Sequence, residues 1–449
     1  IASNIQIGVG ETKIFNLYAW LKSDAQNASL GKYFVTQISA RGEYLPDGEN
    51  TEIDENLKTI EIDFKEGTID KNIKQVQKGN NVEFTLTPSD SSVTLNKLNI
   101  TCLSGTVPTV SGNTLTISNV QKNEFCQVYK KEETTLLSQL LADKTTRPGA
   151  RTSFSSVLTT DNAKTLYSST EDSKTVYYFA GNATDNWVKF GKNASNQDLY
   201  WRIIRTNSDG GVRLLYHGTS TTATDAYIGT SKFNSSYNNI AYVSYMYGNL
   251  GSVANARENT TNSTIKTLID NWYKDNLNTN YGKYLSTTAV YCNDRSTSNN
   301  ADFGARTRLY INETPSYDCT ATEDKFTVDS STGNGKLTYP IALMTADEVS
   351  FAGGLYGTNA STWYYYNSAN GSSTGSNWWW LLSPVEWDGS NAFVFIVNGS
   401  SRPGGLSYYS VDGAGGVRPV ISLKSCTLYS TGNGSASDPY TIKETETGC

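Results

Sequence analysis

The chain is poor in the residues on which most enzyme signatures depend. Its 449 residues include one histidine, two methionines and six cysteines, and only 18% are charged. A single histidine cannot build a multi-histidine metal cluster, and no serine or cysteine nucleophile stands beside His217 in a known motif. We therefore expect His217, which ends a predicted strand, to be structural, and we do not expect an enzyme.

Long apolar runs and basic runs are also missing. No segment reaches the roughly 20 consecutive apolar residues that cross a bilayer, and the chain does not start like a signal peptide. The net charge is −6, and no lysine/arginine run is long enough to follow a phosphate backbone. We expect no nucleic-acid partner, and we expect any export signal or membrane or wall anchor to lie outside this chain.

Adjacent carboxylates do not indicate acid–base chemistry here. Glu171-Asp172 and Glu323-Asp324 lie in polar loop sequence, and Asp347-Glu348 begins a predicted helix, so solvation and capping explain all three pairs. Glu386-Trp-Asp388 is only superficially similar to a lectin calcium signature. We expect no metal and no cofactor; calcium stays open without a motif that supports it.

The cysteines fall as three sequence-local pairs. Six cysteines allow many connectivities, but local pairing is the simplest, and spacing of the CxxC kind that would favour a metal is absent. Three disulfides would place the protein in an oxidising, extracellular setting. Scattered reduced thiols are the alternative. The favoured pairs are Cys102/Cys126, Cys292/Cys319 and Cys426/Cys449.

The first part of the chain predicts small β modules followed by a spacer. Residues 1 to about 42 alternate in the β manner, and the phrases Ile7-Gly-Val-Gly-Glu-Thr-Lys13 and Leu17-Tyr-Ala-Trp-Leu21 resemble the closing strands of camelysin-type surface proteins. We therefore expect a partial β-rich surface module over 1–65, which ends in an acidic connector. Residues 66–131, with predicted strands at 82–88 and 113–120, resemble an immunoglobulin-like β-sandwich. Leucines at 136, 137, 140 and 141 predict a short helix within a helical or loop linker, 132–165.

Residues 166–449 predict an α+β domain with long loops. Strands at 199–205 and 211–217 are joined by a tight turn, which indicates a hairpin. Apolar residues at helical spacing predict a helix over 264–277, with Asn262 or Ser263 as its cap. Thr345-Ala-Asp-Glu348 is a capping-box sequence that predicts another helix start.

Eight phrases in this region, in this order, resemble a large family of secreted proteins of gut Firmicutes and their relatives. The C-terminal half of that family is similar to the C-type-lectin/formylglycine-enzyme fold of the variable proteins of diversity-generating retroelements. The phrases are Tyr177-Tyr-Phe-Ala-Gly181, Tyr200-Trp-Arg-Ile-Ile-Arg205, Asp270-Asn-Trp-Tyr273, Cys292-Asn-Asp-Arg295, Thr338-Tyr-Pro-Ile341, Thr345-Ala-Asp-Glu-Val349, Trp379-Trp-Leu-Leu-Ser-Pro384 and Gly416-Val-Arg-Pro-Val420.

The resemblance implies a C-type-lectin-like ligand-binding domain over 166–449, in which the final stretch alternates buried anchors with displayed side chains. The expected anchors are Trp380, Ser383, Pro384, Ala392, Val394, Val397, Gly399, Val411, Val417 and Arg418. The expected display positions, and so the candidate ligand-binding residues, are Glu386, Trp387, Asp388, Ser390, Asn391, Phe395, Asn398, Ser400, Ser401, Arg402, Leu406, Tyr408, Tyr409 and Asp412.

The residues themselves support such a division, with an alternative. Trp387, Tyr408 and Tyr409 among glycine-rich loops are typical of a recognition surface built from rigid aromatics on adaptable polar loops. The alternative is that these aromatics pack in a β core. Arg418 suits an ion pair or donation to backbone carbonyls better than ligand contact.

The prediction that follows is an extracellular or cell-surface ligand-binding adhesin. Its partner would be a protein or glycan on a host or microbial surface, and the resemblance implies that the contact segment can be diversified. The alternatives are a structural fibre or pilus subunit, a phage receptor-binding protein and an enzyme of the formylglycine-generating type. That enzyme class depends on active-site cysteines, for which only Cys292 and Cys319 are candidates.

Overall fold

A computed structural model gives the fold of residues 54–91, 93–130, 133–147, 151, 153–155, 162–223, 226–297, 302–366, 378–399 and 401–449. The chain divides into two compact units, with the boundary between Glu133 and Thr134. The strands predicted over residues 1–42 lie outside the described residues. Across the described ranges, no helix combines the length and apolar character needed to span a membrane.

The smaller unit is built from two four-stranded sheets around one apolar core. The alternation predicted from the sequence is present: Val82, Phe84 and Leu86 are buried, while the residues between them are exposed. One sheet, in the order β3-β1-β8-β5, consists of β1 (Leu57–Phe64), β3 (Ile73–Gln77), β5 (Leu98–Cys102) and β8 (Glu124–Lys130). The other, in the order β2-β4-β7-β6, consists of β2 (Gly67–Ile69), β4 (Val82–Pro88), β6 (Thr109–Ser111) and β7 (Thr114–Ile117), and the turn η2 (Leu95–Lys97) precedes β5.

The sandwich begins earlier than residue 66, the predicted boundary. Strand β1 pairs in parallel with β8 and antiparallel with β3, so it is a central strand of the sandwich and not part of the preceding module. A parallel partner more than 60 residues away leaves no local hairpin signal in the sequence.

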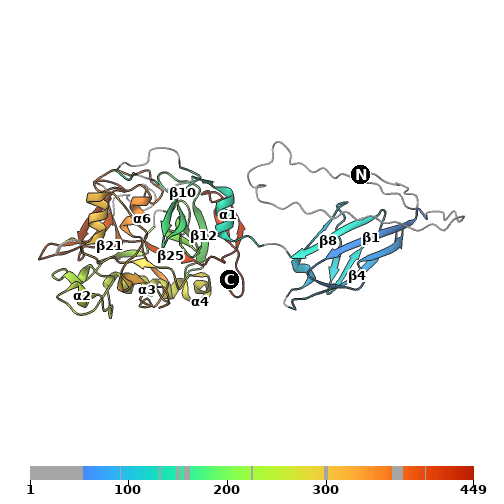
Figure 1. The fold of residues 1–449 in the computed structure, drawn as a ribbon, viewed down its shortest axis with the longest axis horizontal. Coiled ribbons are helices and arrows are strands. Elements are labelled where there is room, and N and C mark those ends of the chain that lie inside the picture. The colour runs from blue at the N-terminus through green and yellow to red at the C-terminus, as the bar shows by residue number, and fades with distance from the viewer. Residues whose placement is uncertain are drawn as a thin grey trace. The chain divides into compact units, whose positions relative to one another are not determined.

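The larger unit contains a ten-stranded sheet (Figure 1). Its main path is β20-β25-β14-β13-β11-β10-β9, and β12 joins it beside β13 and carries β27 and β26. The strands are β9 (Thr145–Thr146), β10 (Thr165–Glu171), β11 (Lys174–Tyr178), β12 (Trp187–Lys192), β13 (Asp198–Thr206), β14 (Val212–Gly218), β20 (Ile341–Leu343), β25 (Pro419–Leu423), β26 (Tyr429–Thr431) and β27 (Tyr440–Ile442).

The predicted linker, 132–165, is in part an element of this larger unit. Helix α1 (Leu136–Asp143) buries Leu136 and Leu140 in the core of the unit, and the Leu136 N–H donates to the carbonyl of Thr427. Strand β9 then pairs with β10. The apolar face of the predicted helix therefore has a partner, and the helix is not a free spacer.

The larger unit also contains a five-stranded sheet, in the order β15-β24-β21-β22-β23. Its strands are β15 (Gly229–Ser231), β21 (Trp379–Trp387), β22 (Ala392–Val397), β23 (Leu406–Ser410) and β24 (Gly415–Val417). Two short ribbons are β16 (Met246–Tyr247) with β17 (Thr261–Asn262) and β18 (Tyr291–Cys292) with β19 (Lys325–Phe326).

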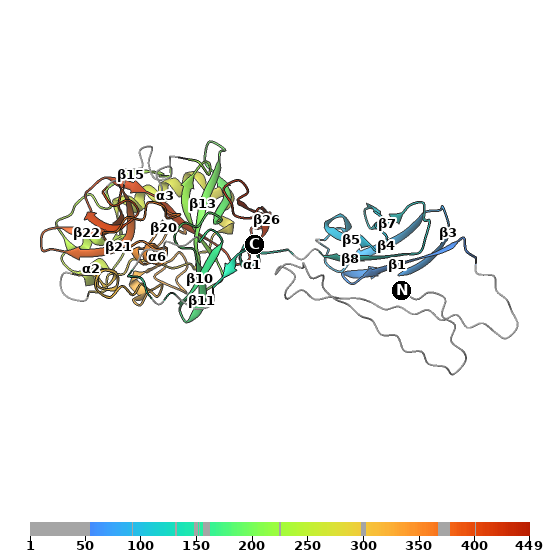
Figure 2. The ribbon, with the colours of Figure 1, turned by 90° about the horizontal axis from the view of Figure 1, so that it is seen from above.

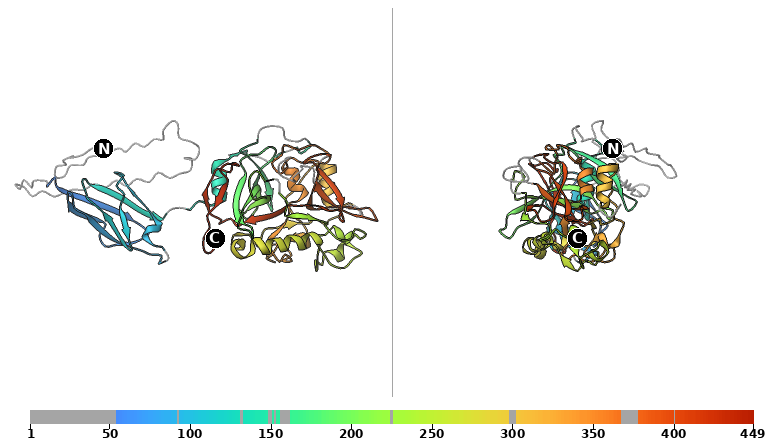
Figure 3. Two further views of the ribbon diagram at one scale, coloured as in Figure 1. Left: turned by 180° about the vertical axis from the view of Figure 1, so that it is seen from behind. Right: turned by 90° about the vertical axis from the view of Figure 1, so that its left-hand side faces the viewer.

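The helices of the larger unit are short, except for α3. Helices α2, α3 and α4 lie along one side of the unit, as Figures 1 and 3 show. The α-helices that follow α1 are α2 (Val253–Ala256), α3 (Thr264–Asn276), α4 (Asn278–Tyr281), α5 (Gly304–Arg306) and α6 (Ala346–Phe351). Short turns are η3 (Ile240–Val243), η4 (Gly282–Tyr284), η5 (Thr307–Asn312) and η6 (Thr322–Asp324).

The local predictions for this unit are confirmed. Strands β13 and β14 form the predicted hairpin, Ser263 caps α3 by accepting from the Lys266 N–H, and Thr345 and Glu348 form the capping box of α6. At the level of fold class, the protein is mostly β, with several sheets and few helices.

The six cysteines form the three expected disulfides, which indicates an extracellular or otherwise oxidising environment. Cys102 and Cys126 are buried cross-strand partners of β5 and β8. The third disulfide differs from this one, because both Cys426 and Cys449 are exposed. It links the loop after β25 to the segment after β27 at the surface, and it adds nothing to the apolar core. The second pair is Cys292–Cys319.

Candidate functional site

The segment with the predicted alternation forms the antiparallel strands β21, β22 and β23. Val394 lies opposite Pro384 on one side and Tyr409 on the other, and Phe395 lies opposite Tyr408. All ten expected anchors are buried: Trp380, Ser383, Pro384, Ala392, Val394, Val397, Gly399, Val411, Val417 and Arg418. Arg418 donates to the carbonyls of Tyr216 and Tyr365, as predicted for a structural arginine.

Most of the expected display positions reach the surface. We call residues 386–412 the contact strip. Within it, exposed side chains are those of Asp388, Ser390, Ser401, Arg402 and Tyr409, and half-buried ones are those of Glu386, Trp387, Asn391, Asn398, Tyr408 and Asp412. Ser400 lies outside the described residues.

Phe395 and Leu406 contradict the prediction, because both are buried, at 0% and 1% exposure. Phe395 lies on the face of β22 that the turn η5 covers, where Tyr310 meets it edge-on with ring centroids 5.3 Å apart. Leu406 is bonded through its backbone to Leu355 and Gly357. Strand alternation alone cannot show that a distant segment covers the second face.

Three carboxylates of the contact strip hold the strip itself. Asp388 accepts hydrogen bonds from the backbone N–H groups of Asn391 and Ser390 at 2.6 and 2.7 Å, and these bonds lower its pKa. Glu386 is ion-paired with Arg306, and Asp412 accepts from the Ser410 hydroxyl at 2.6 Å. These contacts of the three carboxylates stabilise the ends of the hairpins.

Exposed aromatic rings lie on both faces of this sheet. On one face Tyr409 stacks on Trp378, with ring centroids 4.8 Å apart, and Gly415 leaves room for that indole. On the other face Tyr408 meets Phe393 edge-on and runs nearly parallel to Tyr356, 6.4 Å away. The edge strand β23 therefore carries rigid amphipathic rings on both of its faces.

Other parts of the chain add exposed apolar side chains to the same region. Tyr356 is bridged to Leu406, and the carbonyl of Tyr237 accepts from the Ala392 N–H. Ile311 follows Tyr310, which contacts Phe395. In the described part of the larger unit, the exposed large apolar residues are Tyr237, Leu250, Ile311, Tyr356 and Tyr409. Tyr409 lies in β23, and Tyr237 and Tyr356 are bridged to the strip at Ala392 and Leu406. No local signal in the sequence associates Tyr237, Ile311 or Tyr356 with this surface.

The five-stranded sheet occupies one end of the larger unit. Figures 1 and 2 show β21 and α2 at that end, whereas α1 and the C-terminus lie at the opposite end. Because the chain enters the larger unit at Thr134, just before α1, the contact strip lies far from the point of attachment. Cys449 lies at that opposite end as well, so its disulfide with Cys426 is no part of the contact strip.

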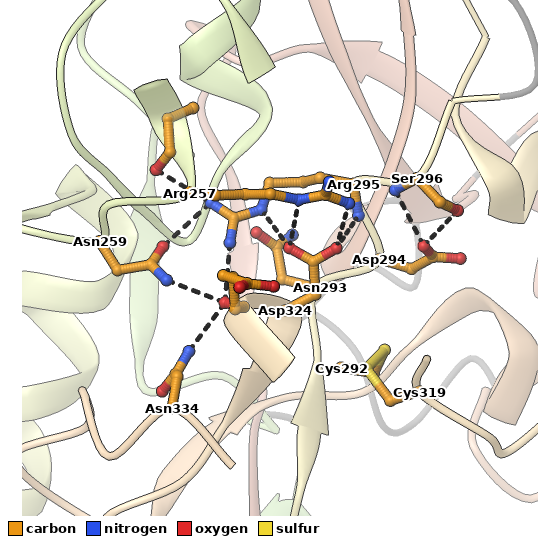
Figure 4. A network of polar contacts seen from close by, with 12 residues as sticks. Arg257, Asn259, Cys292, Asn293, Asp294, Arg295, Ser296, Cys319, Asp324 and Asn334 are labelled. Carbon is orange, nitrogen blue, oxygen red and sulfur yellow. Dashed lines mark hydrogen bonds and ion pairs between the residues drawn. A yellow bond between two sulfur atoms is a disulfide. The ribbon is translucent and has the colours of Figure 1, made fainter. Parts of the chain in front are cut away.

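A buried polar network (Figure 4) is bonded to strand β21, whose last residues begin the contact strip. The Arg295 guanidinium is fully buried and donates to Asp324 at 2.8 Å, to Asn259 and to three backbone carbonyls, while Arg257 also pairs with Asp324. The amide of Asn293 donates to the carbonyl of Leu382 in β21. The motif Cys292-Asn-Asp-Arg295 therefore connects strand β21 to the loops around η6.

Asp294 extends this network to helix α6. Its carboxylate pairs with Arg308, which also pairs with Asp347 at 2.9 Å, and these contacts outweigh burial and keep the pKa of Asp294 low. The Cys292–Cys319 disulfide lies beside this group. Buried charges that are all paired in this way favour a fixed scaffold over a reactive centre.

His217 is buried, as expected for a structural residue. Burial, and then the nearby guanidinium groups of Arg202 and Arg418, holds its pKa well below 6.5. Among the described residues, no group of three or more His, Cys, Asp or Glu side chains is placed to hold a metal ion.

The buried histidine predicts a specific acid sensitivity. An unfolded His217 takes up a proton below pH 6.5 and the folded one does not. The free energy of unfolding is therefore unaffected by this group above pH 6.5, and below that pH it falls by about 1.4 kcal/mol per pH unit. In urea titrations at pH 7 and pH 5, we expect the stability difference between wild type and His217→Gln to change by about 2 kcal/mol. Parallel curves for the two proteins would contradict this.

No protein-family model, no curated protein and no solved structure matches this chain.

Proposed function

We propose that the larger unit is an extracellular ligand-binding domain that contacts its partner through the contact strip and the neighbouring Tyr237, Ile311 and Tyr356. The observation that carries the proposal is the segregation of side chains. The expected anchors are buried, whereas the exposed rings of Tyr237, Tyr356 and Tyr409 lie at β22 and β23. Soluble domains seldom leave such residues together at the surface without a partner.

The chemistry of the surface fits recognition of a macromolecule. Tyr and Trp rings supply contact area at a low entropy cost, and Ser, Asn and Gly supply adaptable hydrogen bonds. Arg402 is exposed at the same edge and offers a planar cationic donor. We propose a protein or glycan ligand on a host or microbial surface, and a location of this chain at the bacterial surface.

The resemblance to variable proteins of diversity-generating retroelements extends the proposal. A scaffold whose anchors are buried and whose displayed side chains are exposed tolerates exchange of the latter, because surface substitutions change stability little. We propose that the lectin-like arrangement and the diversification both apply here. A nearby reverse transcriptase gene with a template copy of the 380–420 coding region would support diversification; without them, a fibre subunit or a phage receptor binder is favoured.

The direct test is binding to arrays of glycans and of host and microbial surface proteins. Trp387→Ala, Tyr408→Ala and Tyr409→Ala should each weaken the strongest signal, and central aromatic residues of an interface typically cost about 2 kcal/mol or more, roughly 30-fold in affinity. Tyr129→Ala is the matched control, because Tyr129 is an exposed tyrosine of the smaller unit. Unchanged binding by all three strip variants would contradict the proposal.

Peptide mapping tests the alternative of a formylglycine-generating enzyme. Such an enzyme needs its cysteines as thiols, whereas Cys292 and Cys319 are linked in the structure. We expect mass spectrometry of the unreduced protein to find the Cys292–Cys319 peptide pair. Free thiols at both positions would reopen the enzymatic alternative.

A further inference from the structure

Strand β23 is the outer strand of the five-stranded sheet, and it carries Tyr408 and Tyr409 of the contact strip. Its pairs with β22 keep a single register along the whole strand. Within Leu406–Ser410, all of which the structure describes, there is no charged residue, no proline and no bulge. Edge strands commonly carry one of these features, because each of them prevents pairing with another chain.

The hydrogen bonds on either side of β23 show which of its backbone groups point outward. The Val411 N–H donates to the Ala392 carbonyl in β22, so every second residue from 407 to 411 faces β22. Leu406, Tyr408 and Ser410 therefore face away from β22. Among the described residues, the N–H and carbonyl of Tyr408 and the N–H of Ser410 have no hydrogen-bond partner. Buried backbone groups nearly always have partners, so these groups reach solvent.

The chain's own segment Leu355–Gly357 shows how a backbone bonds to this edge. The Leu406 N–H donates to the Leu355 carbonyl at 2.8 Å, and the Leu406 carbonyl accepts from the Gly357 N–H at 3.1 Å. The segment runs parallel to β23 at the bridge between Tyr356 and Leu406. It then turns at Gly357, which has a φ of +73°, and leaves the edge. The next two outward positions of β23 stay open.

The side chains beside the open positions suit an extended peptide. Tyr408 meets Phe393 and Tyr356 on one face of the sheet, and Tyr409 stacks on Trp378 on the other. A strand added at this edge would point successive side chains to opposite faces. Its apolar side chains would therefore contact an aromatic group on each face, while its backbone supplies a donor and an acceptor at the spacing of β23.

The opposite edge of the same sheet is protected. Strand β15 has three residues, and the Ser231 carbonyl at its end accepts from the Trp380 indole N–H at 2.8 Å. Helix α3 lies beside it, because a Cβ atom added to Gly229 would be 3.9 Å from the Leu268 side chain. A short strand beside a helix is a usual way to prevent pairing at an edge. The contrast between the two edges favours β23 as the one that accepts another chain.

We propose that β23 binds an extended segment of a partner protein, which adds to the five-stranded sheet as a further strand and bonds to the N–H and carbonyl of Tyr408. Main-chain bonds of this kind give affinity, and the side-chain contacts on the two faces give specificity. The inference rests on the proposed function, because it concerns the same surface. It names the partner as a protein with an extended apolar segment and not a glycan.

Selection of phage-displayed random dodecapeptides on the whole chain, followed by fluorescence polarisation with the strongest synthetic peptide, tests the proposal. Tyr408→Ala removes the ring, whereas Tyr408→Pro also removes the outward N–H and keeps the bonds to β22. Tyr408→Pro should bind the peptide about tenfold more weakly than Tyr408→Ala, the usual cost of one hydrogen bond. Equal affinity of the two variants, or a selection that yields no peptide for wild type, overturns the proposal.

Two further measurements separate strand addition from a folding defect. Ser410→Pro and Ser410→Ala repeat the comparison at the second outward N–H, and urea unfolding shows whether each proline variant is folded. In the peptide, N-methylation at every second residue should abolish binding and N-methylation at the residues between should not, because only alternate residues of an added strand bond to β23. Loss of binding without this alternation would also overturn the proposal.

The array measurements test the proposed function separately. If Tyr409→Ala loses array binding while the proline and alanine variants bind the selected peptide equally, the contact strip remains the binding surface and only the strand addition is wrong. If the strip variants keep array binding while the proline variants lose the peptide, strand addition stands and the proposed function is wrong.

Discussion

Arg295→Met should lower the stability of the larger unit by about 3–5 kcal/mol, the usual cost of breaking a buried ion pair from one side. The side chain makes its charged contact with Asp324 and also saturates the carbonyls of Met246, Ala256 and Glu323. Methionine fills the volume but removes the guanidinium donor of the Met246 carbonyl and leaves Arg257 as the remaining cation beside the buried Asp324.

Tryptophan fluorescence during urea unfolding measures this loss in the right unit. Eight of the nine tryptophans lie in 134–449, and none lies in 54–130, so the signal reports the larger unit. Arg402→Met is the matched control, because the same exchange at an exposed position should change stability by less than about 0.5 kcal/mol. Equal unfolding midpoints for the two variants would contradict a supporting role for the network.

Glu348→Gln should be similarly damaging, by about 3–5 kcal/mol at neutral pH. Glu348 is buried and pairs with Arg205 at 2.9 Å and with Arg213 at 2.6 Å. Arg205 keeps Glu171 as a partner, but Arg213 has no second carboxylate among the described residues. Its buried charge is then left uncompensated.

The pH dependence of this variant follows from the same contacts. Burial opposes ionisation of Glu348, but Arg213 and Arg205 outweigh it and lower its pKa from 4.5 to about 2. This lowered pKa gives a stabilisation that is complete above pH 4.5 and is lost as the pH falls toward 2, about 3 kcal/mol in all.

Urea titrations at pH 7 and pH 3 test whether the stabilisation by Glu348 is lost as the pH falls. The stability gap between wild type and Glu348→Gln should narrow at the lower pH. The exposed Glu313→Gln is the matched control and should show little gap at either pH. A gap that stays constant from pH 7 to pH 3 would be inconsistent with a carboxylate held ionised by two arginines.

The sequence predicted the features that depend on neighbours along the chain. The capping box at Thr345, the cap at Ser263 and the β13–β14 hairpin are set by residues a few positions apart, and they are present. The anchors from Trp380 to Arg418, which the resemblance to variable proteins implied, are also buried.

Features that depend on distant segments were missed. Phe395 was expected at the surface, but η5 comes from more than 80 residues earlier and covers its face. Tyr356 joins the contact surface because its neighbours Leu355 and Gly357 bond to the backbone of Leu406, and Tyr237 joins it because its carbonyl accepts from the Ala392 N–H. No local pattern encodes these bonds. Likewise β1 pairs with β8 across most of the smaller unit, so the domain boundary was placed too late.

The cysteines show both what spacing along the chain can predict and what it cannot. Their spacing predicted the pairing of Cys426 with Cys449, which is present. Spacing carries no information about burial, however. Strands β25 and β27 are part of the larger sheet, whereas Cys426 and Cys449 follow the ends of these strands and are exposed.

Hydrogen–deuterium exchange of the protein, free and bound to its strongest array ligand, tests the central claim most directly. If the contact strip is the binding surface, protection on binding should fall on peptides covering 386–412 and on those containing Tyr237 and Tyr356. Protection confined to other parts of the larger unit, with 386–412 unchanged, would contradict the account.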